Sequence, residues 1–336
     1  MLTTIFQAAY NSCAPGRHCT AGGCAGQMKV LITGGAGFLG SALANRLLAE
    51  GNHVRVLDDL SAGERERLDP RVAFSGGDIR DVPKLWTLLR GVDCVYHLAA
   101  RVSVPESILY PVDYNAVNVG GTVSLLTATR DAQVKRLVFA SSGAVYGEQE
   151  QQPVREDAIL HPATPYAVSK TASEQYVLAI GELWGIETVI LRIFNAYGPG
   201  QPLPPSHAPV VPRFLNQVVS GGSIVLLGDG SQTRDFVYID DVVEALVRAG
   251  QARGINSSIL NIGSGIEVSI TDLANTIMQV TGNRVDCLYR GEGEAGVSRL
   301  VADLTLSREK LGYQPKTTLT EGLRLTIMRD PRFSAT

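Results

Sequence analysis

From Met28 onward the chain alternates short apolar runs with helical stretches, and no other feature of the sequence constrains the fold so strongly. Six apolar runs have the length and composition of buried strands: Lys29–Thr33, Val54–Asp58, Val72–Ser75, Cys94–Leu98, Arg136–Ser141 and Thr188–Ile193. Helical periodicity occurs between them at Phe38–Ala49, at Val112–Asp131 and from Tyr166 to about Gly185. Strands that alternate with helices form a parallel sheet covered on both faces, with ligands at the strands' carboxyl ends. The sequence therefore predicts an α/β fold with a doubly wound parallel sheet.

The pattern changes after Asn195. Residues 202–212 are rich in proline and predict a loop. Two further strands, Ser223–Leu227 and Ser258–Ile262, alternate with helices that begin at Asp240 and Thr271. We therefore expect residues 196–330 to form mainly a smaller α/β lobe, laid over the carboxyl edge of the sheet built by residues 28–195.

Charge and cysteine content exclude several classes of protein. A net charge of -3 over 336 residues argues against a general binder of nucleic acid or membrane surfaces. No apolar run approaches the roughly 20 residues that span a bilayer. Cys94 and Cys287 lie in strand-like runs and are expected to be reduced core residues, whereas the spacing of Cys13, Cys19 and Cys24 fits no zinc pattern. We predict no metal site.

Residues 1–27 are predicted to be a flexible tail. They have neither a basic amino-terminal region nor a long apolar core, so they make a poor secretory signal. A clean strand begins directly after Met28, which makes Met28 the expected alternative start of the chain.

The sequence TGGAGFLG, residues 33–40, joins the first strand to the first helix. Glycines in this place permit a tight turn and a close approach to a pyrophosphate at the helix amino terminus, as in the Rossmann-type dinucleotide fold. Asp58 ends the second strand, where a carboxylate can bind an adenosine ribose and would repel a 2′-phosphate. The pattern therefore favours NAD over NADP. Asp78 ends the third strand and is predicted either to reach the adenine or to cap a helix.

Tyr166 and Lys170 stand four residues apart in the run PYAVSK, in the first turns of a predicted helix. Residues at this spacing share one helix face. An ammonium group near a phenol favours the phenolate, so the pair has the chemistry of a tuned acid and base. Lowering a tyrosine pKa from about 10 to about 7 requires roughly 4 kcal/mol, of which one ammonium supplies only a part.

Together these segments resemble the extended short-chain dehydrogenase/reductase family, and within it the nucleotide-sugar epimerases and dehydratases. The resemblance covers roughly residues 28–328. It is carried by ordered matches to ten motifs: TGGAGFLG (33–40), LDDLSAG (57–63), GDI (77–79), HLAA (97–100), NVGGT (118–122), FASSGAVYG (139–147), PYAVSK (165–170), LRIFNAYGPG (191–200), GDGSQTRDFVYIDD (228–241) and NIGSG (261–265).

The resemblance implies a catalytic set of Ser142, Tyr166 and Lys170. It also implies a set of residues that bind NAD, which includes Tyr166 and Lys170 together with Gly34, Gly37, Phe38, Leu39, Gly40, Asp58, Asp59, Leu60, Ser61, Ala62, Gly63, Asp78, Ile79, Leu98, Ala99, Ala100, Arg101, Val102, Asn118 and Phe194. The implied contacts to the nucleotide-diphosphate substrate, besides Ser142, are Asn195, Pro209, Val210, Val225, Leu226, Leu227 and Arg234. Arg234 suits phosphate oxygens through its planar fork, and a structural ion pair with Asp235 or Asp240 is the alternative.

One region departs from the family pattern, which usually carries R-x-G-D before the last substrate contacts. Here Arg290 and Arg299 both remain candidates for a second phosphate contact. Leu300, three residues before Asp303, falls where the size of a residue helps to select the sugar. A tyrosine there would exclude an N-acetyl group and a serine or cysteine would admit it, so leucine leaves the sugar open.

The two residues after Ser142 indicate which reaction follows oxidation at sugar C4. The dehydratases of the family carry acids there, and its decarboxylases carry a glutamate at the second position, whereas this chain has Gly143 and Ala144. The resemblance therefore implies an NAD-dependent UDP-hexose 4-epimerase. The alternatives are a 4,6-dehydratase with displaced acids, a 4-ketosugar reductase and a non-catalytic NAD-sensing module. The family also implies a homodimer, formed by the helices at 112–131 and 166–185, and a cytoplasmic location.

Overall fold

A computed structural model describes residues 27–291 and 297–334. Its centre is a parallel sheet of seven strands in the order β11-β6-β5-β4-β1-β2-β3. The strands are β1 (Lys29–Thr33), β2 (His53–Asp58), β3 (Ala73–Gly76), β4 (Cys94–His97), β5 (Arg136–Ser142), β6 (Glu187–Ile193) and β11 (Ser258–Ile262). The predicted doubly wound sheet is confirmed, with six strands within about a residue of their expected bounds.

The seventh strand corrects the sequence interpretation, which grouped Ser258–Ile262 with the smaller lobe. Strand β11 instead pairs in parallel with β6, from Ser258 opposite Val189 to Ile262 opposite Ile193. The physical reason is that both strands carry apolar side chains that are buried on the sheet, and pairing satisfies the backbone groups of each. The chain thus returns to the large sheet after it has begun to build the lobe.

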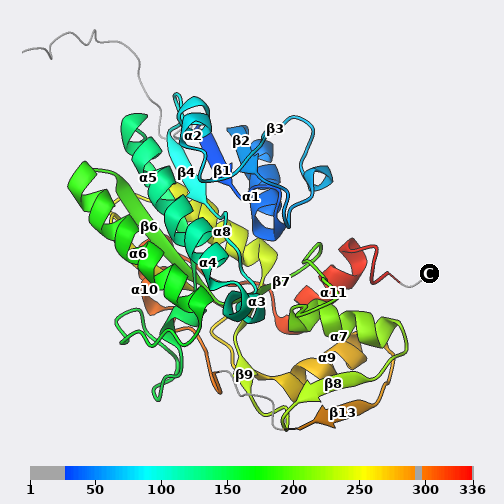
Figure 1. The fold of residues 1–336 in the computed structure, drawn as a ribbon. Helices are drawn as coiled ribbons and strands as arrows, with labels where there is room; N and C mark the ends of the chain where they lie inside the picture. The colour runs from blue at the N-terminus through cyan, green and yellow to red at the C-terminus, as the bar shows by residue number, and fades with distance from the viewer. Residues whose placement is uncertain (1–26, 292–296, 335–336) are drawn as a thin grey trace, which may run out of the picture.

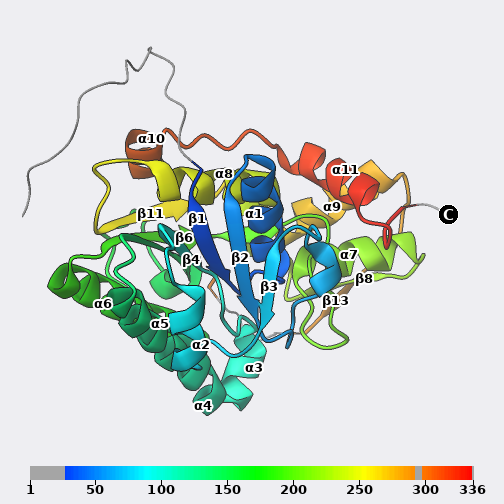
Figure 2. The same cartoon turned by 90° about the horizontal axis from the view of Figure 1, so that it is seen from above.

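Helices cover both faces of the sheet, as Figure 2 shows. Helices α2 (Val82–Leu88), α5 (Gly121–Asp131) and α6 (Pro165–Trp184) lie on one face, and α1 (Phe38–Ala49) with α8 (Ile239–Gln251) lie on the other. Alternate residues of β1 divide between two cores: Val30 and Ile32 pack towards α1, and Leu31 packs towards α2 and α5. This burial on both faces explains the continuous apolar character of the strands.

The predicted helix at 112–131 is helical throughout but not uniform. Helix α4 (Pro111–Tyr114) passes into a π-helical segment, Asn115–Gly120, and then into α5. Such widened turns are frequent at functional sites. The turn contains Asn118, a residue that the resemblance assigns to the cofactor site.

Helix α6 is defined by clear end signals. The hydroxyl of Thr164 accepts a hydrogen bond from the backbone N–H of Ala167 at 3.2 Å, and Pro165 occupies the first helical position. Gly185 ends the helix in the left-handed conformation, at φ 68°. Tyr166 and Lys170 therefore lie in its first two turns, at the end of the helix that faces the carboxyl edge of the sheet.

The smaller lobe lies beyond that edge (Figure 1). It contains α7 (Val210–Val219), the parallel pair β8 (Ile224–Leu227) and β13 (Cys287–Arg290), α9 (Ile270–Thr281) and α11 (Leu319–Arg329). Helix α7 begins at Val210, so the last three residues of the predicted loop are helical. Pro212 is accommodated because it lies in the first turn, where the N–H that it lacks has no helical partner.

The cysteines and the amino-terminal segment were the subject of separate expectations. Cys94 is buried and Cys287 is half-buried, and both are free thiols. Cys13, Cys19, Cys24 and nearly all of the predicted tail lie outside the described residues. Over the described ranges no helix has the length and hydropathy to cross a membrane.

Candidate active site

The turn between β1 and α1 brings backbone into close contact with the next loop. Gly34 adopts φ 68°, and a Cβ there would lie 2.6 Å from the backbone nitrogen of Ala99. A Cβ on Gly40 would overlap the carbonyl oxygen of Gly34. Helix α1 starts after Gly37 with no side-chain cap and no acidic residue in its first turn. Its first N–H groups and its positive end are therefore left for an anion, as a bound pyrophosphate requires.

Asp58 joins this turn to the loop that follows β2. The carboxylate is buried and accepts hydrogen bonds from the backbone N–H groups of Ala36 at 2.9 Å and Leu60 at 2.8 Å. A Cβ on Gly63 would lie 2.8 Å from Oδ1 of Asp58, so the loop at 59–63 is folded tightly around the carboxylate. Two bonds leave part of its acceptor capacity for ribose hydroxyls. The turn, the helix end and this carboxylate together fit a dinucleotide.

The predicted contact of Asp78 with the adenine stays a prediction, whereas the alternative role of Asp78 as a helix cap is not observed. Asp78 forms a two-oxygen contact with the side chain of Arg80, at 2.9 and 2.5 Å, and this hydrogen bonding lowers the pKa of Asp78. Asp81, not Asp78, caps α2 by accepting from the N–H of Lys84 at 3.1 Å. Ile79 is buried against Gly121, whose Cβ would lie 2.5 Å from it.

Asn118 ties the loop after β4 to helix α6. Its side-chain oxygen accepts from the N–H of Arg101 at 2.8 Å, and its amide donates to the carbonyl of Arg101 at 3.0 Å and to the Ser169 hydroxyl at 2.9 Å. This amide therefore sets the path of Leu98, Ala99, Ala100 and Val102 beside the glycine turn. The Arg101 side chain lies over the ring of Tyr114, 5.5 Å from its centre.

Ser142, Tyr166 and Lys170 meet at the carboxyl end of β5. Ser142 is the last residue of that strand, and Tyr166 and Lys170 are buried in α6, which packs on β5. Lys170 Nζ donates to the carbonyl of Ala140 at 2.8 Å and lies 4.9 Å from the centre of the Phe139 ring. Burial lowers the pKa of Lys170 from 10.5 to about 8, and the charge of Glu174 acts in the opposite direction.

The expected depression of the Tyr166 pKa involves both Lys170 and the positive nicotinamide of bound NAD⁺, and it stays a prediction. Burial raises the pKa of the Tyr166 phenol above 10, and hydrogen bonding with Ser142 opposes that rise only in part. The protein alone therefore holds a protonated phenol at neutral pH.

Phe194, which is predicted to flank the nicotinamide, and the residues predicted to contact the substrate lie on several segments. Phe194 packs against Gly143, whose Cβ would lie 3.3 Å from the ring, and Asn195 begins β7 (Asn195–Tyr197). Pro209 and Val210 stand at the start of α7. Val225, Leu226 and Leu227 lie in β8, opposite Leu288, Tyr289 and Arg290 of β13.

Arg234 and Leu300 are brought together by Asp235. The backbone N–H of Asp235 donates to the carbonyl of Leu300 at 3.1 Å, and the buried Asp235 carboxylate accepts from Ser264, Gly265 and Ala302. The carboxylate is thus engaged by other segments, and the Arg234 guanidinium donates to the carbonyl of Thr233 at 2.7 Å.

The two other candidate arginines differ in their engagement. Arg299 forms a two-point ion pair with Glu267, at 2.7 and 2.8 Å. Arg290 ends β13 with its side chain exposed. The geometry thus leaves Arg290 as the less engaged of the two.

Sequence reasoning missed Glu174 and Arg192, which form a buried ion pair between α6 and β6. A signal for it exists, because an arginine stands inside the apolar run TVILRI and a glutamate follows Lys170 by one helical turn. A buried charge needs a partner, so each residue predicts the other.

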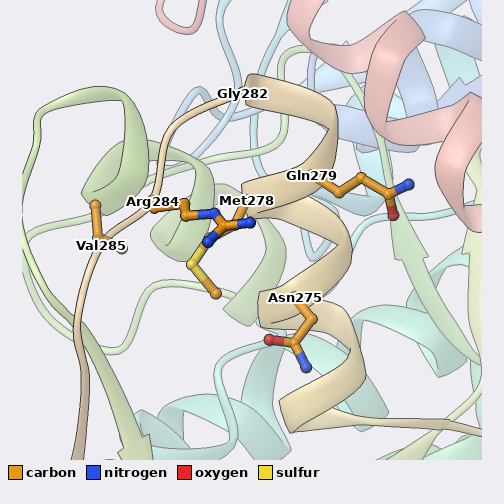
Figure 3. A pocket seen from close by; sticks show the side chains of 6 residues that line it. All are labelled: Asn275, Met278, Gln279, Gly282, Arg284 and Val285. Carbon is orange, nitrogen blue, oxygen red and sulfur yellow. The ribbon is translucent and has the colours of Figure 1, made fainter.

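Away from these residues, a surface concavity of about 580 Å³ lies at the end of α9 (Figure 3). It is lined by Asn275, Met278, Gln279, Gly282, Arg284 and Val285. None of the predicted site residues is among them.

Comparison with known proteins identifies the class to which this fold and site belong. Residues 30–263 match the model of the NAD dependent epimerase/dehydratase family. The chain therefore belongs to this family. It is an NAD-dependent enzyme of the extended short-chain dehydrogenase/reductase type, and the prediction of NAD as the cofactor is confirmed.

The relatives of this chain include several UDP-glucose 4-epimerases and also UDP-sugar decarboxylases. The UDP-glucose 4-epimerase of Mycolicibacterium smegmatis is 38% identical over 307 residues, which cover 89% of this chain and 97% of that protein. The structure of a Thermotoga maritima UDP-glucose 4-epimerase with UDP-glucose has a TM-score of 0.86 at 35% identity and covers 89% of this chain and 97% of that one. A Thermus thermophilus UDP-glucose 4-epimerase in complex with NAD has a TM-score of 0.83 at 35% identity, with 92% and 100% covered.

Proposed function

We propose that this protein is a UDP-hexose 4-epimerase that oxidises the sugar at C4 and returns the hydride to the opposite face. The observation that carries the proposal is the meeting of Ser142, Tyr166 and Lys170 at the carboxyl end of β5, with Gly143 packed against Phe194. These three residues suit the oxidation of a sugar hydroxyl to a ketone. Gly143 has no side chain that could act as the acid in the elimination of water that a dehydratase carries out.

The reaction follows from what each side chain can do. Tyr166, as phenolate, takes the proton of the sugar 4-hydroxyl, and Ser142 hydrogen-bonds the same oxygen. Bound NAD⁺ supplies the hydride acceptor, and its positive ring favours the phenolate whose pKa the protein alone raises. Lys170 holds a positive charge beneath the site. The 4-ketone then turns over and takes the hydride back on its other face, while the proton returns from Tyr166.

Packing at Gly143 supports an epimerase over a dehydratase. A side chain at Gly143 would meet the Phe194 ring, so an acid there would require that ring to move. Glu148 is the carboxylate that follows in sequence, and it accepts hydrogen bonds from both the backbone N–H and the hydroxyl of Ser298. A carboxylate engaged in this way is a poor candidate for a displaced acid.

The proposed cofactor contacts are those named above for the glycine turn, the loop at 58–63, the loop at 98–102 and Asn118, with Phe194 beside the nicotinamide. Asp58 favours NAD over NADP, which weighs against a reductase fed by free NADPH. Retention of both Tyr166 and Lys170 weighs against a non-catalytic NAD sensor. The proposed diphosphate contacts are Arg234 and one of Arg290 and Arg299.

A direct assay tests the proposal. Purified protein is incubated separately with UDP-glucose, UDP-N-acetylglucosamine and UDP-glucuronate, and the products are separated as intact nucleotide sugars. We expect the C4 isomer of at least one of them without added reductant. The absence of any isomer would defeat the proposal, and loss of the 6-oxygen would indicate a dehydratase.

We also propose that two copies associate through α4 and α6. Val112 on α4 and Val168, Tyr176 and Leu183 on α6 are exposed apolar side chains. The three on α6 share one outward side of the helix, where a second copy can bury them. The family resemblance implies a dimer through the helices at 112–131 and 166–185, of which these residues form part. A cytoplasmic location remains a prediction.

A further inference from the structure

A buried ion pair lies beneath the proposed catalytic residues. Arg192 of β6 donates from Nε and Nη2 to the two carboxylate oxygens of Glu174 on α6, at 3.1 and 2.8 Å. The two side chains are only 3% and 0% exposed. A third guanidinium nitrogen donates to the carbonyl of Glu156 at 3.1 Å, so both charges are enclosed by specific partners.

Fold stability alone does not account for this pair. Removing two charges from water costs several kcal/mol each, and replacing a buried pair by well-packed apolar residues is often neutral or stabilising. An apolar pair would also suit the position, because the neighbouring residues Val177, Leu191 and Ile193 are buried and apolar. The pair therefore calls for a role that apolar side chains cannot fill.

The contacts of the pair lead directly to the proposed catalytic set. Glu174 follows Lys170 by one turn of α6, and the hydroxyl of Ser141 donates to the Glu174 carboxylate. Ser141 stands between Ala140, whose carbonyl accepts from Lys170, and Ser142. One carboxylate is thus bonded to the strand end that carries Ser142 and lies on the helix that carries Lys170.

Arg192 extends the connection to the cofactor side. Its guanidinium lies over the Tyr146 ring, 4.8 Å from the centre, and Tyr146 contacts Phe194 with ring centres 6.2 Å apart. Tyr146 is fixed at its other end by donating to Asn261 at 2.6 Å. The side chain proposed to flank the nicotinamide is therefore supported by the same pair.

We propose that the Glu174–Arg192 pair is a positioning device, which holds Lys170 and Ser142 where they can support loss of the Tyr166 proton. The proposal rests on the role given to Tyr166 under the proposed function. Glu174 and Arg192 are positioning residues, since neither contacts the proposed reacting atoms.

The charges around Lys170 favour this role for Glu174. His97 of β4 is neutral, because burial lowers its pKa to about 3, and it bonds Thr33 and Thr122. Tyr166 faces Lys170 from its own helix, and Arg192 from β6 is neutralised within the pair. Glu174 is thus the group that favours the ammonium form of Lys170.

The test replaces both charges at once, by Glu174→Met with Arg192→Leu, so that no unpaired charge is left buried. Ionisation of the phenol is followed by ultraviolet absorbance in NAD-loaded protein, against the same protein carrying Tyr166→Phe. We expect Tyr166 to titrate at least about one pH unit higher, which means about tenfold less phenolate at neutral pH. With a UDP-hexose, kcat should fall about tenfold while KM changes less than about threefold.

Glu187→Gln is the matched control. Glu187 of β6 pairs with Arg136 of β5 at the amino-terminal ends of these strands, far from the end that carries Ser142 and Arg192. It should leave the phenol titration unchanged. Arg192→Lys serves if the double variant does not fold, since it keeps the charge but cannot engage both Glu174 oxygens, and a smaller rise in the same direction is expected.

Unchanged titration and unchanged kcat in a folded double variant or in folded Arg192→Lys would overturn the inference and leave the epimerase proposal intact. If the wild-type protein converts no UDP-hexose, the proposed function fails. The phenol titration still decides in that case whether the pair positions Lys170 and Ser142 beside Tyr166.

Discussion

At the scale of single residues, the proposed chemistry depends most on Tyr166. Tyr166→Phe removes the proposed base and retains the ring, so turnover should fall by roughly a hundredfold or more while NAD stays bound. Epimerisation and the NAD content of the purified protein are both measured. Tyr176→Phe, at an exposed position of the same helix, is the control and should retain turnover. Wild-type rates in Tyr166→Phe would refute the assigned role.

Lys170 gives a second prediction, on stability against pH. Its pKa is about 8 in the folded protein and near 10.5 unfolded, so charging it in the buried site costs about 3 kcal/mol at pH 7. The cost is fully present below pH 8 and disappears as pH rises towards 10.5. The free energy of unfolding of Lys170→Met relative to wild type should therefore decrease by about 2 kcal/mol between pH 7 and pH 9.5. Denaturant unfolding at both pH values measures this, and an equal difference at the two would contradict it.

At the scale of elements, the turn from β1 into α1 depends on the absence of a side chain at Gly40. Gly40→Ala should displace the turn, because the new Cβ would overlap the Gly34 carbonyl, and NAD affinity should fall about tenfold or more. Isothermal titration with NAD measures the effect. Gly120→Ala is a matched helical control, since the nearest atom to its Cβ would be 3.9 Å away, and should bind NAD normally. Equal affinity in both variants would show that the turn does not carry the dinucleotide.

At the scale of the whole molecule, the exposed apolar residues on α4 and α6 predict a dimer. Light scattering should give about twice the 35.9 kDa of one chain, and Val112→Lys with Leu183→Lys should give single chains. Met328→Lys places the same charge on α11, where Met328 is 68% exposed, and should leave the mass unchanged. A wild-type protein that stays monomeric at micromolar concentration would refute the arrangement.

Local signals predicted most of the sheet and the main candidate residues. The strand Lys29–Thr33 and the helix Phe38–Ala49 could be predicted because their apolar periodicity and the glycines between them are signals that lie within a short stretch of sequence. The contact of Asp78 with Arg80 and that of Arg299 with Glu267 were not foreseen. Each charged side chain has several possible partners in the sequence, and only the folded backbone selects one of them.

Long-range pairing limited the rest of the prediction. The sequence of Ser258–Ile262 predicts a strand but does not show which sheet the strand joins. The choice depends on the free edge of β6, with which the strand pairs in the folded protein. The rise in the Tyr166 pKa was likewise hidden, because it depends on burial in the folded protein.

The return of the chain to β11 determines how this enzyme can be recombined with its relatives. Helix α8 and strand β11 follow part of the lobe in sequence yet belong to the layers around the large sheet. A chimaera with a single crossover near residue 196 would take its outermost strand and one covering helix from a foreign parent. Exchange of substrate preference therefore requires two grafted segments, one on each side of residues 239–262.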